Sequence, residues 1–129
     1  MSGCADVCIS GDYDGFNDFY SESAPKARKP HRCCECNDAI PVGAQYERAN
    51  GKTDGDFWSE ATCLTCKEIR GAFVCGPHTF TMLWESIRDY MFPVWNEKGA
   101  VDCLAKLTTL EAREKCRREY AKWQKDWAA

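Results

Sequence analysis

The chain has 129 residues, a formal net charge of −3 and ten cysteines. This length suits one compact domain, so residues 1–129 are expected to form a single domain. The slightly acidic balance excludes a global positive field that would draw the chain to nucleic acid or a membrane surface, although a local patch could still bind. No apolar run approaches the roughly 20 residues that span a bilayer, and no export signal precedes the first cysteines. We therefore expect a cytoplasmic protein without membrane contact, in which cysteines hold metal or lie buried more often than they form disulfides.

Residues 1–25 are predicted to be an acidic, aromatic arm. The first 22 residues hold five acids and no base, with four aromatic side chains among them. The aromatic side chains argue against full disorder, so we expect an ordered loop rather than a regular element. Aromatic anchors among carboxylates suit a basic protein partner. The candidate partner-binding residues are Tyr13, Asp14, Phe16, Asp18 and Phe19. The alternative is that these aromatic side chains pack on the chain's own helices.

A basic segment, residues 26–32, follows the arm and contains no acid. Lysine and arginine can bind phosphate without a positive charge on the whole chain. We call residues 26–32 the hook. A second hypothesis is therefore nucleic-acid binding through the hook and through the basic face of residues 113–125. The hook residues that would contact phosphate are Lys26, Arg28, Lys29 and Arg32.

Residues 44–49 and 57–61 are predicted to form two strands. The residues between them include Asn50-Gly51 and Asp54-Gly55, which tolerate the positive φ of tight turns. A hairpin with a long loop is expected. Residues 63–70 then read as a short helix with Thr62 as its N-cap and Gly71 near its end.

The strongest motif is a pair of Cys-x2-Cys sequences, Cys33–Cys36 and Cys63–Cys66, separated by 26 residues. Two residues between thiolates let a tight turn direct both sulfurs at one ion, and zinc takes four such ligands in a closed structural site. The second pair opens a predicted helix, where free amides stabilise thiolate. Cys34 is an alternative to Cys33 as ligand, although Cys34-x-Cys36 is too short for the usual knuckle.

These residues carry a resemblance. The order of Cys33-x2-Cys36, Ile40, Gly43 and Tyr46, a hairpin with Trp58, and Cys63-x2-Cys66 at a helix start resembles the treble-clef zinc fingers of LIM domains and their relatives, over residues 31–72. The resemblance implies one shared zinc ion held by the four cysteines. The whole arrangement is also similar to small zinc proteins of phages and prophages, which implies a host protein, such as a defence or transcription component, as the partner.

A second zinc site is a further hypothesis. Cys4-x3-Cys8 and Cys75-x2-His78 could together provide four ligands, which would give two zinc ions per chain. The alternative is that these cysteines are packed or free thiols, as is usual for lone cysteines. Cys103 and Cys116 are expected in the core.

Residues 73–129 are predicted to extend the zinc module, at residues 26–72, with two amphipathic helices. An apolar stripe recurs at helical spacing between Phe80 and Met91. The last helix is expected to start with a capping box of Thr108 and Glu111. Its aromatic side chains, Trp123 and Trp127, could pack inward or join two chains as a homodimer. The expected fold class is thus a small zinc-stabilised α+β domain.

The sequence argues against an enzyme. It has two histidines, and neither lies on the predicted hairpin, where a treble-clef nuclease of the HNH type would need a general base. No phosphate-binding glycine loop is present, and four thiolates leave zinc no open position for water. We therefore expect a non-enzymatic zinc-binding interaction module, with nucleic-acid binding as the alternative. A redox thiol sensor at Cys33-Cys34 ranks behind both.

Overall fold

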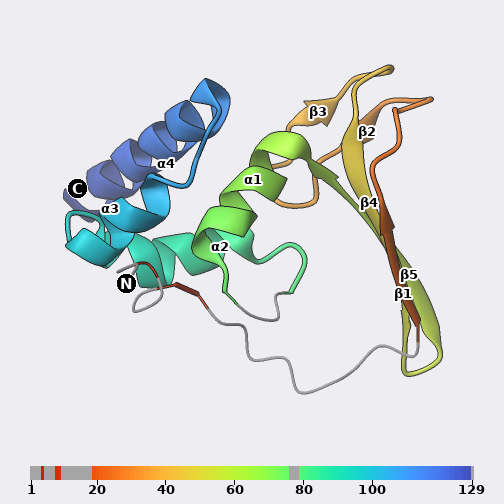
Figure 1. Ribbon diagram of the computed structural model, residues 1–129, viewed down its shortest axis with the longest axis horizontal. Helices are drawn as coiled ribbons and strands as arrows, with labels where there is room; N and C mark the ends of the chain where they lie inside the picture. Colours follow the sequence, from red (N-terminus) through yellow and green to blue (C-terminus); the bar gives the residue numbers. More distant parts are fainter. Residues whose placement is uncertain (1–3, 5–7, 10–18, 76–78, 129) are drawn as a thin grey trace.

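The computed structural model describes residues 4, 8–9, 19–75 and 79–128, and it is a small α+β structure. Strands β1 (Phe19–Ser23), β4 (Tyr46–Thr53) and β5 (Asp56–Cys63) form an antiparallel sheet in the order β1-β4-β5. Strands β2 (His31–Arg32) and β3 (Ala39–Ile40) form a short second ladder. The helices lie together to one side of the long sheet, which extends away from them (Figure 1).

The hairpin between β4 and β5 is tighter than predicted. Its turn is Asp54-Gly55, where both residues have positive φ, of 52° and 88°. Asn50-Gly51 is not a turn but lies inside β4, because Gly51 pairs with Trp58. The Trp58 ring covers Gly51 so closely that a Cβ at that position would collide with it. Glycine is therefore needed there for close approach rather than for its φ angle.

Part of the acidic arm is a regular strand, contrary to the expected loop. Phe19–Ser23 pairs with β4 from Phe19↔Lys52 to Ser23↔Arg48. The same register continues to an isolated bridge between Lys26 and Gln45. Residues 19–23 of the arm and Lys26 of the hook thus lie along one edge of the sheet. Residues 10–18, which hold Tyr13, Asp14, Phe16 and Asp18, lie outside the described residues.

Helix α1 (Leu64–Phe73) follows β5 directly. Its N-cap is Cys63, whose sulfur accepts a hydrogen bond from the Cys66 amide, and not the predicted Thr62. The helix also continues past Gly71 to Phe73, because Ile69, Ala72 and Phe73 are buried and this packing outweighs the weak helix propensity of one glycine. The α1 helix therefore starts within the metal motif and ends in the helical core.

The predicted helix over residues 80–91 starts later, at Leu83, and is irregular. It consists of α2 (Leu83–Ser86), the wider π turn η2 (Ile87–Met91) and the short 3-10 turn η3 (Phe92–Val94). Leu83, Trp84, Ile87 and Met91 are buried as predicted, but Tyr90 is 68% exposed. The wider turn rotates successive side chains less than a strict 3.6-residue period assumes, so Tyr90 leaves the apolar stripe.

Two further helices close the chain, α3 (Lys98–Leu104) and α4 (Leu110–Ala128). The start of α4 differs from the predicted capping box. Thr109, not Thr108, accepts from the Ala112 amide at 3.2 Å. The backbone amides of Thr108 and Thr109 donate hydrogen bonds to the carboxylate of Glu68 in α1, and not to that of Glu111. Thr109 is thus a local cap, whereas the Glu68 carboxylate adds a tertiary contact between α1 and the start of α4, which local sequence spacing cannot reveal.

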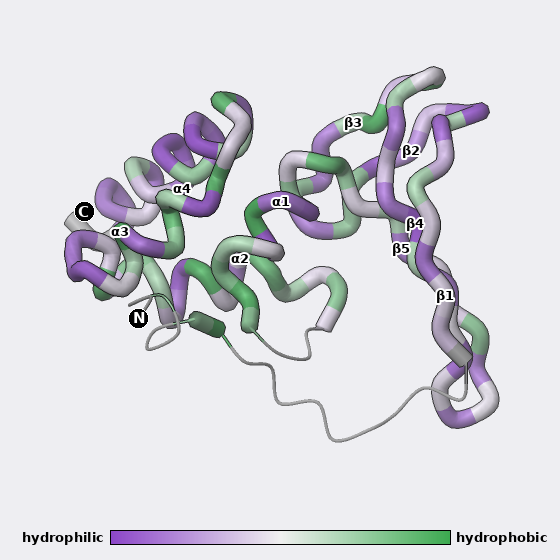
Figure 2. Tube along the Cα trace, in the orientation of Figure 1, coloured by the Kyte–Doolittle hydropathy of each residue, from purple (hydrophilic) through white to green (hydrophobic). Residues whose placement is uncertain are grey.

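The main core lies among the helices, where Figure 2 shows most of the hydrophobic positions. Phe73, Phe92, Trp95, Tyr120 and Trp123 form a chain of aromatic contacts with ring centroids 5.0 to 5.8 Å apart. These contacts join α1, η3 and α4. Trp123 therefore packs inward, and the homodimer stays a prediction. Among the described helices, none has the length and apolar character needed to cross a bilayer.

Candidate metal centre

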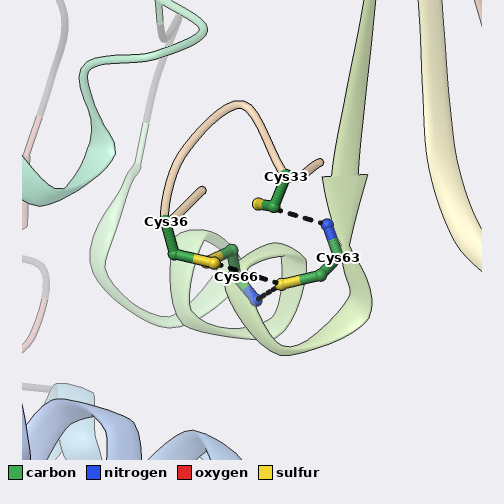
Figure 3. Close-up of side chains that lie close together, drawn as sticks. All are labelled: Cys33, Cys36, Cys63 and Cys66. Carbon is green, nitrogen blue, oxygen red and sulfur yellow. Dashed lines mark hydrogen bonds between the residues drawn. The ribbon is translucent and has the colours of Figure 1, made fainter. Parts of the chain in front are cut away.

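Four cysteine sulfurs converge at the junction of the knuckle, β5 and α1. Cys33 and Cys36 come from the turn after β2, Cys63 ends β5, and Cys66 lies in the first turn of α1 (Figure 3). All four sulfur atoms lie within 4.8 Å of one another. Cys33 and Cys66 are buried, and Cys36 and Cys63 are partly buried. The predicted ligand set therefore forms a site that could hold a metal ion.

The spacing of one sulfur pair fits tetrahedral coordination. Cys36 Sγ and Cys63 Sγ are 3.8 Å apart. Four sulfurs at about 2.3 Å from a central zinc ion would lie about 3.8 Å from one another, the edge of that tetrahedron. The two sulfurs are too far apart for a disulfide bond, which is about 2.05 Å long, and their distance suits two ligands of one ion.

Backbone amides point at two of the sulfurs. The Cys63 and Glu35 amides each donate to Cys33 Sγ at 3.4 Å. The Cys66 amide donates to Cys63 Sγ at the same distance, because Cys63 is the N-cap of α1 (Figure 3). Hydrogen bonds of this kind stabilise thiolate over thiol. The local backbone thus prepares the sulfurs to bind a cation.

The pKa values of the clustered cysteines are shifted in opposite directions. Hydrogen bonds from Cys36, Cys63 and Cys66 lower the pKa of Cys33 far below its usual range. Hydrogen bonding to Cys33, Cys36 and Cys63 raises the pKa of Cys66 far above its usual range. Like charges this close cannot all form without a counter-ion. A divalent cation would take the place of the protons and hold all four sulfurs as thiolates.

Cys34, the alternative ligand, lies apart from the cluster. Its sulfur is 3.4 Å from Thr62 Oγ1. Burial raises the pKa of Cys34 to about 12, so its thiol stays protonated at neutral pH. Cys33 is the member of this pair that faces the other three ligands.

A lysine that the sequence did not single out lies beside the centre. Lys115 of α4 is buried, and its Nζ is 2.6 Å from Asp38 Oδ2 on the knuckle. Although burial opposes its charge, the hydrogen bond to Asp38 and the negative field of Cys36 raise the pKa of Lys115. Its charge would offset part of the double negative charge of a centre with four thiolates and a divalent cation. An open groove of about 380 Å³ between the knuckle and α4 reaches Cys63 from the same side.

The second predicted site is arranged differently in the structure. Cys8 does lie against Cys75, as that hypothesis required, but the two form a disulfide. Cys4 forms a second disulfide with Cys103, which had been expected as a core thiol. His78 lies outside the described residues. A second metal ion at these cysteines would first require reduction of both bonds.

The hook is a fixed and exposed surface segment. Ala27 pairs with Ala44 and Gly43 through two hydrogen bonds of 2.8 Å, and the His31 ring packs on Tyr46. The side chains of Lys26, Arg28, Lys29 and Arg32 are all exposed between and around these anchors. On α4, by contrast, several bases are already paired. Lys115 binds Asp38, Arg117 binds Glu114, and Lys122 binds Glu119.

Fold and site together define a small cysteine-rich α+β protein with a four-cysteine site that could hold a metal ion. No protein-family model matches this chain, and it has no significant match among curated proteins or solved structures.

Proposed function

We propose that the chain is a zinc-stabilised binding module without catalytic activity. The observation that carries this proposal is the convergence of four cysteine sulfurs within 4.8 Å of one another, with one pair at 3.8 Å. Four soft thiolate ligands favour zinc, and they leave no open position at which zinc could activate water. The turn with Cys33 and Cys36, the β4–β5 hairpin and α1 follow one another in the order found in treble-clef zinc fingers. This order supports a treble-clef fold for the zinc module. Zinc binding would contribute folding free energy in the part of the chain formed by the three-stranded sheet, which has little hydrophobic core of its own.

Native mass spectrometry of the reduced full chain tests the metal. We expect one zinc ion per chain, retained in Cys34→Ser and lost in Cys66→Ser. Cys34 is the matched control because it is adjacent to the ligands yet outside the cluster. Iron in place of zinc would assign the same ligands to a redox centre. No metal in any preparation would overturn the proposal.

The first candidate partner is a protein that meets the acidic arm. Asp14, Asp18 and the aromatic side chains around them would steer and anchor a basic surface. For a phage-type chain this partner would be a host protein, such as a defence or transcription component. Changing Asp12, Asp14 and Asp18 together to Lys should abolish capture of the partner from host lysate. Unchanged capture would remove the arm from the interface.

The second candidate partner is nucleic acid, and the exposed hook is the observation in its favour. Both ends of the hook are anchored to the sheet, so its bases are displayed at little entropic cost. The double variant Arg28→Glu, Lys29→Glu should abolish retardation of labelled nucleic acid at low salt. Retardation that is unaffected by this variant would rule out the hook.

A further inference from the structure

The three-stranded sheet separates its charges between two faces. The β4–β5 register places alternate residues of each strand on a common side, and the β1–β4 register adds alternate residues of β1. We call one side the outer face, and its described residues with exposed or partly exposed side chains are Ser21, Ser23, Arg48, Asn50, Lys52, Phe57, Ser59, Ala61 and Cys63. In the described strands this face carries two bases and no acid.

The acids of the same strands all lie on the opposite, inner face, where the register places Glu22, Glu47, Asp56 and Glu60. Helix α1 contacts that face at Glu47 through Arg70, whose Nη2 lies 2.7 and 2.8 Å from the Glu47 oxygens. Phe80 covers the other end, with its ring 5.6 Å from that of Trp58. The labelled helices all lie on this side of the sheet (Figure 1).

We propose that the outer face binds single-stranded nucleic acid. Arg48 and Lys52 would contact phosphates, and a base would stack on Phe57, whose side chain is 77% exposed. Positive groups that follow the backbone, combined with an aromatic platform for bases, are the general features of single-strand recognition on open sheets. The inference rests on the proposed function in that it names the partner class of the binding module.

The charged groups are spaced and held for this role. Arg48 and Lys52 are four residues apart on β4, or about 13 Å, a span of a few nucleotides. The Arg48 guanidinium donates to Ser59 Oγ at 2.7 Å and to Tyr46 Oη at 3.0 and 3.1 Å. Lys52 Nζ lies 5.2 Å from the centre of the Phe57 ring. The two cations are thus oriented before any ligand binds.

The outer face continues into the hook. Tyr46, which accepts from Arg48, also lies 3.4 Å from His31 Nε2 at the end of the hook. The exposed Arg28 and Lys29 lie between this contact and the Ala27–Ala44 pairing. A strand that crosses the outer face could therefore reach further cations without leaving the surface.

The composition of the outer face favours nucleic acid over a protein partner. The centre of a protein interface is depleted in Lys and Ser and needs clustered apolar side chains. Among the described side chains of the outer face, Phe57 is the one that is large, apolar and exposed, and it lies among Arg, Lys, Asn and Ser. Asn50 and Ser59, which pair across the strands between the two cations, provide hydrogen-bonding groups for base edges.

Fluorescence anisotropy with labelled 12-nucleotide RNA and DNA single strands tests the proposal on the zinc-loaded full chain. Phe57→Ala should weaken binding roughly tenfold or more, the loss typical for one stacked base. Lys52→Glu should weaken binding and lower the slope of log affinity against log salt by about 0.7 or more. The matched controls are Tyr90→Ala, an exposed aromatic side chain in η2, and Lys106→Glu, an exposed base before α4. Both controls should bind as the unmodified chain does.

Three results would overturn the inference. The first is no binding at about 50 mM salt, and the second is equal weakening by the control variants. The third is equal affinity for polyglutamate, which would make the face a site for acidic protein. Native mass spectra of the same samples separate the two proposals. Intact zinc without nucleic-acid binding contradicts this inference alone, whereas absent zinc contradicts the proposed function.

Discussion

Glu47→Gln tests whether a buried ion pair ties the sheet to α1. Glu47 is 2% exposed and accepts two hydrogen bonds from Arg70 Nη2, with Lys67 Nζ at 3.8 Å. Arg70 is also largely buried, with 12% of its side chain exposed. The substitution keeps the size of the side chain and removes its charge. It therefore leaves the buried Arg70 guanidinium without its hydrogen-bonded counter-ion.

The expected cost is large for a single charge. Removing one partner of a buried pair typically costs 3–5 kcal/mol, because the remaining charge keeps its desolvation penalty. Arg70 Nη1 is already buried without a hydrogen-bond partner, so the guanidinium has no other acceptor to replace Glu47. The amide oxygen of glutamine can keep one hydrogen bond. We expect a loss of about 3 kcal/mol, or about 10 °C in Tm for a chain of this size.

Urea unfolding of the zinc-loaded protein, followed by Trp fluorescence, measures this loss. The matched control is Glu114→Gln, which removes the same charge from an exposed pair with Arg117 on α4. Exposed pairs contribute about 0–1 kcal/mol, so the control should unfold almost as the unmodified chain does. Replacing both buried partners, as Glu47→Leu with Arg70→Met, should recover much of the loss. If Glu47→Gln cost no more than Glu114→Gln, the buried pair would not be a link between sheet and helix.

Four further predictions concern the packing, the charge beside the candidate metal centre and the cysteines. Gly51→Ala should lower the free energy of unfolding by about 2 kcal/mol, because the new Cβ collides with Trp58. Gly71→Ala, with open space around its Cβ, should raise that free energy by about 0.5–1 kcal/mol, and urea curves compare the two. Lys115→Met should weaken zinc binding about 10- to 100-fold against a competing chelator, through loss of the cation beside the centre, whereas Lys122→Met on the exposed face should not. Alkylation of the denatured, metal-free and unreduced chain should modify six of the ten cysteines, and ten modified residues would show that the two disulfides are absent.

The four clustered cysteines could be predicted from sequence because their arrangement depends on local geometry. Two residues between cysteines allow one turn to place both sulfurs, whatever the rest of the chain does. The hairpin and α1 were found for a similar reason, since alternation and helical periodicity are local patterns. The observed ends of these elements differ from the predicted ones. Gly51 stands inside β4 because Trp58 lies across it, and α1 starts one residue later than expected because Cys63 is its cap.

The tertiary structure decided the features that join residues distant in sequence. Glu68 caps α4 from 41 residues away, Lys115 reaches Asp38 across 77 residues, and Cys4 pairs with Cys103 across 99. No periodicity or spacing encodes such contacts, because they depend on how the elements pack. The charge-segregated sheet is of the same kind. The sequence alone determined which side chains alternate along each strand, but only strand pairing and the position of α1 decided which face stays open.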